Sequence, residues 1–176
     1  MFQGQAMTFQ GWTLLRRGNP RAAVTRIRDG LAAARATQAH VFEPIFLGFL
    51  AEALGRTGAI PEGLKALTDA LEIAAASGQN WADAELYRLR GDVLIGSPSP
   101  DRAEAEACFR KALAIAREQG TRGFELRAAV SLARLLGDQG RRTEACDLLV
   151  PVYGWFTEGF DTQDLKQAKT LLDELP

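Results

Sequence analysis

Residues 84–113 read AELYRLRGDVLIGSPSPDRAEAEACFRKAL, and this stretch decides the fold. Both of its halves have apolar residues three or four positions apart, which is the period of an α-helix. Between the halves, residues 96–100 hold a glycine and two prolines, which interrupt a helix. Small residues recur on both sides of this break, at Gly91, Ala105 and Ala112. The stretch therefore predicts two antiparallel helices that pack closely.

The same order of residue sizes recurs along the chain at a spacing of 40 to 42 residues. A small residue in the first helix of each pair is followed, in the second helix, by a small residue, a large residue and a third position that is small in three units and valine in the fourth. The four sets are Gly11, Ala23, Ile27 and Gly30; Ala51, Gly63, Leu67 and Ala70; Gly91, Ala105, Phe109 and Ala112; and Ala133, Ala145, Leu149 and Val152. Two helices approach closely only where small side chains meet, and a large side chain one turn away then fills the groove. The repetition predicts a stack of helix-turn-helix units.

Glycine and proline mark the predicted turns, at residues 18–20, 58–61, 96–100 and 138–140. Glycine ends a helix because it adopts the left-handed conformation at little cost, and proline in the first turn of the next helix loses no backbone hydrogen bond. Asn19 before Pro20 and Ser99 before Pro100 are the predicted helix caps.

These signals divide the chain into four helix pairs and a final helix within one domain that spans residues 1–176. The pairs run over about 3–37, 41–77, 81–119 and 121–157, and the final helix over about 162–175. Leu165, Ala168, Leu172 and Leu175 form one apolar stripe on this last helix. It is expected to cap the stack, with Asp161 or Thr162 at its start.

Several aromatic residues and one proline lie at informative places. Phe42 begins a strongly apolar helix that is expected to be buried, and Trp81 is expected to pack against the helix before it. Pro151 predicts a kink or a stop in the eighth helix. The aromatic run at residues 153–156 is expected to be buried by the final helix.

The order of residues resembles the tetratricopeptide repeat (TPR), in which an aromatic, a leucine and a glycine mark the first helix and an alanine, an aromatic and an alanine mark the second. The third unit carries the resemblance most clearly, at Tyr87, Gly91, Leu94, Ala105, Phe109, Ala112 and Leu113. The resemblance implies an all-α, right-handed α-solenoid of about four TPR-like repeats plus a C-terminal capping helix.

Two departures refine this resemblance. The period exceeds the usual 34 residues, and the proline expected at the end of each unit is absent. Both features look like the long-helix variety found in large bacterial signalling proteins, including the sensor region of the maltose regulator. HEAT-type repeats share the period and remain the alternative at the level of the fold.

The segments AELYRL (84–89), ELRAA (125–129) and VYGWFTEGFDT (152–162) look like the C-terminal end of bacterial multidomain proteins. In those proteins, an adenylate or guanylate cyclase domain and a predicted ATPase domain precede a helical-repeat tail. Under this resemblance, the chain corresponds to the tail alone.

The composition argues against nucleic-acid binding, a membrane span and a cysteine metal site. The formal charge of -1 gives no net field toward phosphate backbones, so nucleic-acid binding is disfavoured despite several arginines in residues 11–35. No apolar run is long enough for a membrane span, and no signal peptide opens the chain, so a cytoplasmic location is expected. Cys108 and Cys146 lack metal-ligand spacing and are expected to be small buried residues in a reducing compartment.

Nothing in the sequence indicates catalysis, a metal or a cofactor. His40 is the one histidine and is expected to be a surface loop residue, because no second ligand lies at metal-binding spacing. No glycine-rich loop has the lysine and hydroxyl that bind phosphates. The chain is therefore expected not to be an enzyme.

The TPR resemblance implies that the first helix of each pair lines a concave face that binds a protein or peptide. Carried over by position, the candidate partner-binding residues are Trp12, Arg16, Glu52, Arg56, Arg88, Asp92, Arg127 and Arg134. Recurring arginines would suit a partner that carries carboxylates, because guanidinium pairs with carboxylate in a forked geometry. The alternative is that these charges pair with one another across neighbouring repeats.

The leading hypothesis is therefore a non-catalytic protein-interaction or scaffold module of a bacterial signalling protein. One alternative is a regulatory domain that senses a small ligand in its groove, as the resemblance to the maltose regulator implies. Another is a structural or homodimerisation element, which exposed aromatic residues would favour.

Overall fold

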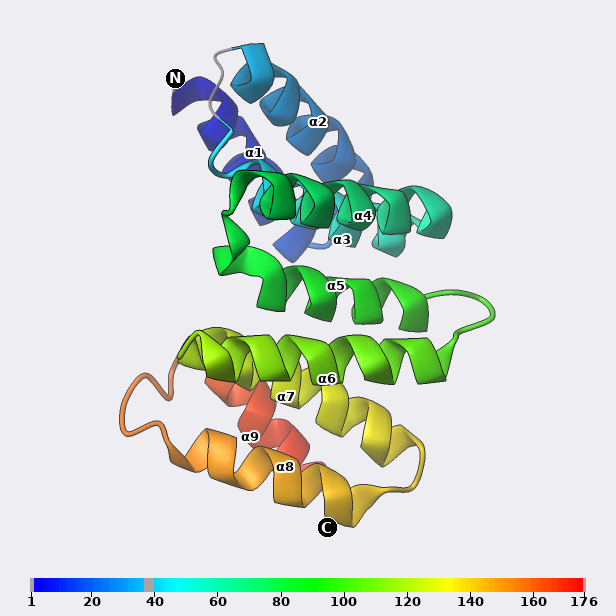
Figure 1. Ribbon diagram of the computed structural model, residues 1–176. Helices are drawn as coiled ribbons and strands as arrows, with labels where there is room; N and C mark the ends of the chain where they lie inside the picture. Colours follow the sequence, from blue (N-terminus) through cyan, green and yellow to red (C-terminus); the bar gives the residue numbers. More distant parts are fainter. Residues whose placement is uncertain (1, 37–39, 176) are drawn as a thin grey trace.

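A computed structural model describes residues 2–36 and 40–175, and these residues form a stack of α-helices without β-strands (Figure 1). The predicted end of the first pair at residue 37 lies outside the described residues. The helices are α1 (Phe2–Arg16), α2 (Pro20–Ala36), α3 (Glu43–Thr57), α4 (Ile60–Ser77), α5 (Asp83–Ile95), α6 (Arg102–Glu118), α7 (Arg122–Asp138), α8 (Arg142–Gly154) and α9 (Gln163–Glu174). One 3₁₀ turn, Asn80–Ala82, precedes α5. No helix within these residues is long and apolar enough to cross a membrane.

Consecutive helices pack as pairs, and the pairs stack in chain order, as the all-α solenoid prediction requires. The odd-numbered helices also pack on one another from pair to pair, α1 on α3, α3 on α5, α5 on α7 and α7 on α9. In a curved stack the inner elements lie closest together, so the odd-numbered helices form the inner wall. Long side chains bridge the outer helices: Arg28 in α2 pairs with Glu62 in α4 at 3.1 Å, and Arg110 in α6 with Glu144 in α8 at 2.7 Å.

The repeated pattern of small and large residues determines how the two helices of each pair pack, and we call it the packing code. Every residue of the four sets is buried. A Cβ atom on Gly11 would lie 2.5 Å from Cγ1 of Ile27, and one on Gly91 would lie 2.3 Å from Cε1 of Phe109. Each of these glycines therefore leaves the space that the large residue of its partner helix fills.

The predicted helix cap is confirmed at the start of α2 and is wrong at the start of α6. Asn19 Oδ1 accepts a hydrogen bond from the backbone N–H of Ala22, as predicted. The cap of α6 is Asp101 rather than Ser99, because its carboxylate accepts the N–H of Glu104 at 2.9 Å. At α9, Thr162 holds the cap position, but its hydroxyl donates to the carbonyl of Gly159 instead of accepting from the helix.

The prediction for the C-terminal aromatic run is confirmed in part, because Tyr153 and Phe156 are half-buried and pack against the core to which α9 contributes. Helix α8 continues through Pro151 and ends one turn later at Gly154. Trp155 is not buried by α9, because its side chain is 54% exposed and lies under the guanidinium of Arg122, 4.9 Å from the ring centroid. Phe160 is also exposed, beside the ring of Tyr153.

The cysteines are free, with Cys108 buried as expected and Cys146 half-buried. Burial raises the pKa of the Cys108 thiol. This thiol therefore stays protonated at neutral pH and is a poor nucleophile.

Substitution of Gly30 tests the packing code. A Cβ atom there would lie 2.7 Å from the backbone N of Thr8 and 2.8 Å from the carbonyl O of Gly4, and neither atom can move by rotamer change. Gly30→Ala should lower the free energy of unfolding by about 2 kcal/mol, the usual range for overpacking, although alanine is the better helix former.

Gly123→Ala is the matched control, because nothing lies within 4 Å of a Cβ at this helical glycine. This variant should be unchanged or more stable by up to about 1 kcal/mol. Urea denaturation of both variants measures the difference, and equal stabilities would contradict the packing code.

Candidate ligand-binding groove

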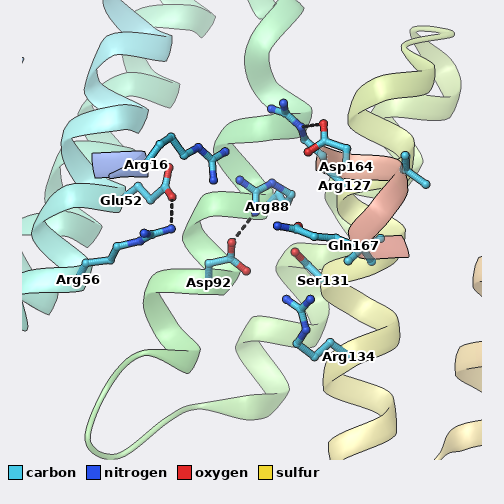
Figure 2. Close-up of a pocket in the computed structure, with 12 residues that line it drawn as sticks. Arg16, Glu52, Arg56, Arg88, Asp92, Arg127, Ser131, Arg134, Asp164 and Gln167 are labelled. Carbon is cyan, nitrogen blue, oxygen red and sulfur yellow. Dashed lines mark hydrogen bonds and ion pairs between the residues drawn. The ribbon is translucent and has the colours of Figure 1, made fainter. Parts of the chain in front are cut away.

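A polar cleft of about 180 Å³ opens on the inner side of the stack (Figure 2). Side chains from α1, α3, α5, α7 and α9 meet there. The residues that line it are Arg16, Glu52, Arg56, Arg88, Asp92, Leu126, Arg127, Val130, Ser131, Arg134, Asp164 and Gln167. A second open hollow adjoins it and adds Trp12, Thr162 and Gln163 to the wall.

Helical spacing explains why these side chains share a face. Glu52 and Arg56 lie four positions apart on α3, as do Arg88 and Asp92 on α5, so each pair points to the same side of its helix. The other side of each helix carries the small buried residues of the packing code. Packing of the pairs thus turns one polar stripe per helix into a continuous wall.

A buried ion pair lies at the centre of this wall. The Glu85 carboxylate is 4% exposed and accepts Arg88 Nε and Nη2, both at 2.8 Å. It also accepts Arg127 Nη1 at 3.3 Å, from the next pair of helices. Three N–H groups thus replace the water that this carboxylate loses on folding.

The charges of this group set its protonation. Burial by itself would raise the pKa of Glu85, but the Arg88 and Arg127 guanidiniums outweigh it and hold that pKa below its ordinary value. Burial likewise works to lower the pKa of Arg88, but the Glu85 and Asp92 carboxylates raise it. Glu85 and Arg88 are therefore both charged at neutral pH.

Three further carboxylates pair with arginines of this wall. Arg88 also pairs with Asp92 one turn along α5. Arg127 Nε donates to Asp164 of α9 at 2.7 Å, and Arg56 Nη2 donates to Glu52 at 2.9 Å (Figure 2).

Arg16 and Arg134 differ from the other arginines of the cleft in their surroundings. Neither Arg16 nor Arg134 has a carboxylate within ion-pair distance among residues 2–36 and 40–175. Arg16 lies over the ring of Trp12, with Cζ 5.0 Å from the centroid. Both side chains are exposed, so their guanidiniums are free to meet a ligand.

The structure brings the candidate residues together. Of the eight that the sequence analysis named, all but Trp12 line the polar cleft, and Trp12 lines the adjoining hollow. Their role in partner binding stays a prediction. The alternative that these charges pair across neighbouring repeats holds for Arg127 alone among these arginines, since it contacts carboxylates of α5 and α9. The other ion pairs of the group form within one helix.

Sequence reasoning did not place Ser131, Asp164 or Gln167 in the cleft. Asp164 and Gln167 flank the apolar stripe of α9, and which flank faces the groove depends on how this helix rotates against α7. The one available signal was their three-residue spacing, which puts both on one side of the helix.

An aromatic cleft of about 210 Å³ lies beside the polar one, and the two share Arg127. Its walls are Phe9, Phe42, Ile45, Phe49, Trp81 and Phe124, together with Glu85 and Arg127. Phe42 and Trp81 were expected to be buried or packed on a neighbouring helix. They instead contact each other edge to face, with ring centroids 6.1 Å apart, and are 39% and 40% exposed, because Phe42 lies just before α3 and Trp81 in the turn before α5.

The described part of the chain shows no cluster of three histidine, cysteine, aspartate or glutamate side chains that could hold a metal ion. His40 is exposed, as expected, and its Nδ1 lies 2.9 Å from the Glu43 carboxylate. Most charged side chains of the groove are hydrogen-bonded to one another, at Glu52 with Arg56, at Arg88 with Asp92 and at Arg127 with Asp164.

Comparisons with known proteins support the fold. No protein-family model matches the chain, and no curated protein matches it. Among solved structures, the chain is similar to a protein of Podosopora anserina described as a kinesin light chain with nearly identical TPR-like repeats, with a TM-score of 0.68 and 17% identity over 97% of this chain and 84% of that one. A single-substitution variant of that protein gives a TM-score of 0.69 with the same identity and coverage. At this identity the likeness shows a TPR-like solenoid fold alone.

Glu85→Ala should destabilise the fold, because Arg88 would stay buried with only Asp92 to compensate it. Breaking a buried ion pair costs about 3 to 5 kcal/mol, and the remaining Asp92 contact puts the expected loss at about 3 kcal/mol. The control is Asp173→Ala, which removes the partner of Lys169 in an exposed pair. Urea denaturation should show a much larger loss for Glu85→Ala, and similar losses in the two variants would show that the buried pair does not support the wall.

The lowered pKa of Glu85 also predicts a pH dependence. Its ionised form stabilises the fold above the ordinary glutamate pKa of 4.5, and this contribution is lost as the pH falls from there through the lowered value. The free energy of unfolding should therefore fall below about pH 4.5 and fall less steeply in Glu85→Gln. The fall does not vanish in the variant, because the pKa values of Glu43, Glu106 and Glu125 are lowered too. Parallel curves for the two proteins would contradict the assignment.

Proposed function

We propose that this chain is a non-catalytic protein-interaction module whose inner groove binds an acidic segment of a partner protein. The observation that carries the proposal is the cluster of five guanidiniums in one open cleft, two of which have no carboxylate partner among the described residues. Carboxylates of a peptide would pair with these two in a forked geometry. The TPR-like fold supports the proposal, because stacked repeats of this kind present an extended concave surface.

The aromatic cleft gives the proposed partner a second feature. Trp81, Phe42 and Phe9 are each at least 39% exposed in one hollow, and exposed aromatic surface marks sites of protein contact. The shared wall residue Arg127 places apolar and basic surface side by side. A segment with a large apolar side chain next to acidic residues would use both.

The open shape of these clefts favours a peptide over a small molecule. Sites for small ligands bury about 70 to 90% of the ligand. Here the aromatic walls are exposed, and the polar cleft opens to solvent. The alternative of a small-ligand sensor is thus less well supported, whereas the exposed aromatic residues also support the alternative of a homodimerisation element.

The cellular setting is part of the proposal and rests on sequence resemblance. Segments 84–89, 125–129 and 152–162 support a C-terminal repeat region, of the long-helix variety, in a bacterial signalling protein with cyclase and ATPase domains. We infer four repeats with α9 as their capping helix, acting in the cytoplasm.

Selection from a random peptide library, with the whole chain as bait, tests the proposal. Enriched peptides should be acidic and should contain a large apolar residue. Trp81→Ala should weaken an enriched peptide at least about tenfold by fluorescence anisotropy, which is typical of truncating an aromatic anchor.

Trp155→Ala is the matched control, since this tryptophan is also exposed but lies outside the groove, beneath Arg122. Its affinity should stay within about twofold of the unsubstituted chain, because it removes no groove contact. Thermal denaturation confirms that both variants fold. Enrichment of basic peptides, or equal losses from the two substitutions, would reject the proposal.

A further inference from the structure

Exposed hydrophobic side chains gather at one edge of the stack. The chain connections alternate between two edges, so the ends of the even-numbered helices and the starts of the odd-numbered helices that follow them lie together. Figure 1 shows the turn before α5 and the loop between α8 and α9 on this side, at the left. The large hydrophobic side chains exposed in these connections are Val41, Phe42, Trp81, Trp155 and Phe160. Among the described residues, the turns of the opposite edge expose none.

This edge carries both a cleft and an exposed segment. The cleft is the aromatic one, with Phe42, Trp81 and Phe124 in its walls. The segment is WFTEGFD (155–161), in which Trp155 is 54% exposed. Both adjoin the start of α7, because Phe124 lines the cleft and Arg122, two residues before it, lies over the Trp155 ring. Trp155 does not line the cleft of its own chain.

The cleft has the size and the chemistry for one aromatic side chain. Its volume is about 210 Å³, and most of its wall residues are aromatic. An apolar cavity of about 150 Å³ accommodates benzene, so the larger cleft has room for a phenyl or indole ring. Aromatic rings also pack edge to face or offset on one another, as Phe42 and Trp81 already do. A tryptophan from another molecule is therefore a suitable occupant.

Charge supports the same contact. Glu158 and Asp161 of the segment are exposed and have no cation within ion-pair distance among residues 2–36 and 40–175. Beside the cleft, Arg117 and Arg122 share the single carboxylate of Glu125. Both arginine side chains are about half exposed, so each can also pair with a carboxylate of another molecule.

The exposed aromatic surface is large enough for a stable interface. Phe9, Phe42, Trp81, Trp155 and Phe160 are each 39 to 54% exposed. An aromatic side chain buries about 150 to 250 Å² when it is fully covered, so together these five expose roughly 450 Å² per chain. A stable interface buries about 800 Å² per partner, of which a little over half is apolar. The aromatic side chains of this edge alone can supply that apolar part.

We propose that two copies of this chain form a two-fold dimer in which Trp155 of each copy enters the aromatic cleft of the other. In a two-fold interface, the contact that one copy makes with its partner is made in return by the partner. Such an exchange needs the cleft and the segment on one side of the chain, and both lie at this edge. Trp155 has only to rotate away from Arg122, and side chains at interfaces commonly change rotamer on binding.

This inference rests on the proposed function, because it uses the same aromatic cleft, and it names a second copy of the chain as the partner of that cleft. Residues 155–161 match the kind of segment proposed above, a large apolar side chain next to acidic residues. A two-fold contact closes on itself, so the assembly stops at two chains.

Sedimentation equilibrium of the whole chain tests the dimer, over concentrations from about 1 to 500 μM, which cover the range of weak protein association. The average mass should rise from the 19.1 kDa of one chain toward twice that value. A mass that stays at one chain throughout, or that keeps rising beyond two chains, would overturn the proposal.

Substitutions locate the contact. Trp81→Ala and Trp155→Ala should each weaken the dimer about a hundredfold, because truncation of an aromatic anchor costs about tenfold and the two-fold axis repeats the loss. Val150→Ala is the control and should change the dissociation constant less than about twofold, since Val150 is as exposed as Trp155 but lies within α8, before the connection to α9. Thermal denaturation confirms that all three variants fold. A dimer that is unaffected by Trp155→Ala would show that another surface holds it.

A mixture of the two tryptophan variants tests the pairing itself. The mixed dimer keeps one complete contact, in which Trp155 of the Trp81→Ala chain meets the intact cleft of the Trp155→Ala chain. It should therefore form about tenfold more tightly than the dimer of either variant alone. If the clefts instead packed on each other, mixing would give no gain, and the exchange of Trp155 would be wrong.

Peptide binding separates this inference from the proposed function. Peptide affinities are measured at chain concentrations below the dissociation constant of the dimer, where the cleft is open. If the chain stays a monomer but acidic peptides with an apolar residue bind and lose affinity in Trp81→Ala, the dimer is wrong and the interaction module stands. If the dimer forms through Trp81 and Trp155 and the library enriches no peptide, the dimer stands and the binding of a separate partner protein is wrong.

Discussion

The close approach of helix backbones at glycine and alanine positions is the constraint on which the rest of this molecule depends. A methyl group on Gly11 or Gly91 would overlap the large residue of the partner helix, Ile27 or Phe109. Each pair is held in one register, because only that register gives the large side chain a place. Since all pairs follow the same rule, stacking them repeats nearly one rotation and translation, and the odd-numbered helices come to share an inner wall.

The inner wall contains two kinds of cation with different uses. Arg88 and Arg127 are held by Glu85 and by other carboxylates, so their positions are set before any ligand arrives. Arg16 and Arg134 have no such partner in the described part of the chain, and their side chains are exposed. A binding surface gains from this division, because fixed groups shape the groove at no entropic cost on binding, and exposed charges provide attraction at the time of contact.

The features that the sequence predicts are those that depend on spacing along one chain segment. The size pattern, the helix pairs and the Asn19 cap all follow from residues within a few turns of one another. Features that depend on how distant elements meet are predicted poorly. Trp155 was expected to be buried but lies beneath Arg122, and Asp164 lines the groove because of the rotation of α9 against α7, which no spacing encodes. The polar stripes were predictable as stripes, whereas the partner of each charge was not.

The contrast between the two sides of the stack has a mechanical consequence. The inner helices touch directly and each outer helix packs on the inner helix of the next pair, whereas the outer helices meet one another through exposed pairs such as Arg28 with Glu62 and Arg110 with Glu144. Exposed pairs resist separation weakly, since water replaces each contact at little cost. The stack should therefore bend by small separations between the outer helices, while the inner helices stay in contact. Such compliance would let one groove adjust its width to segments of different bulk without breaking any pair of helices.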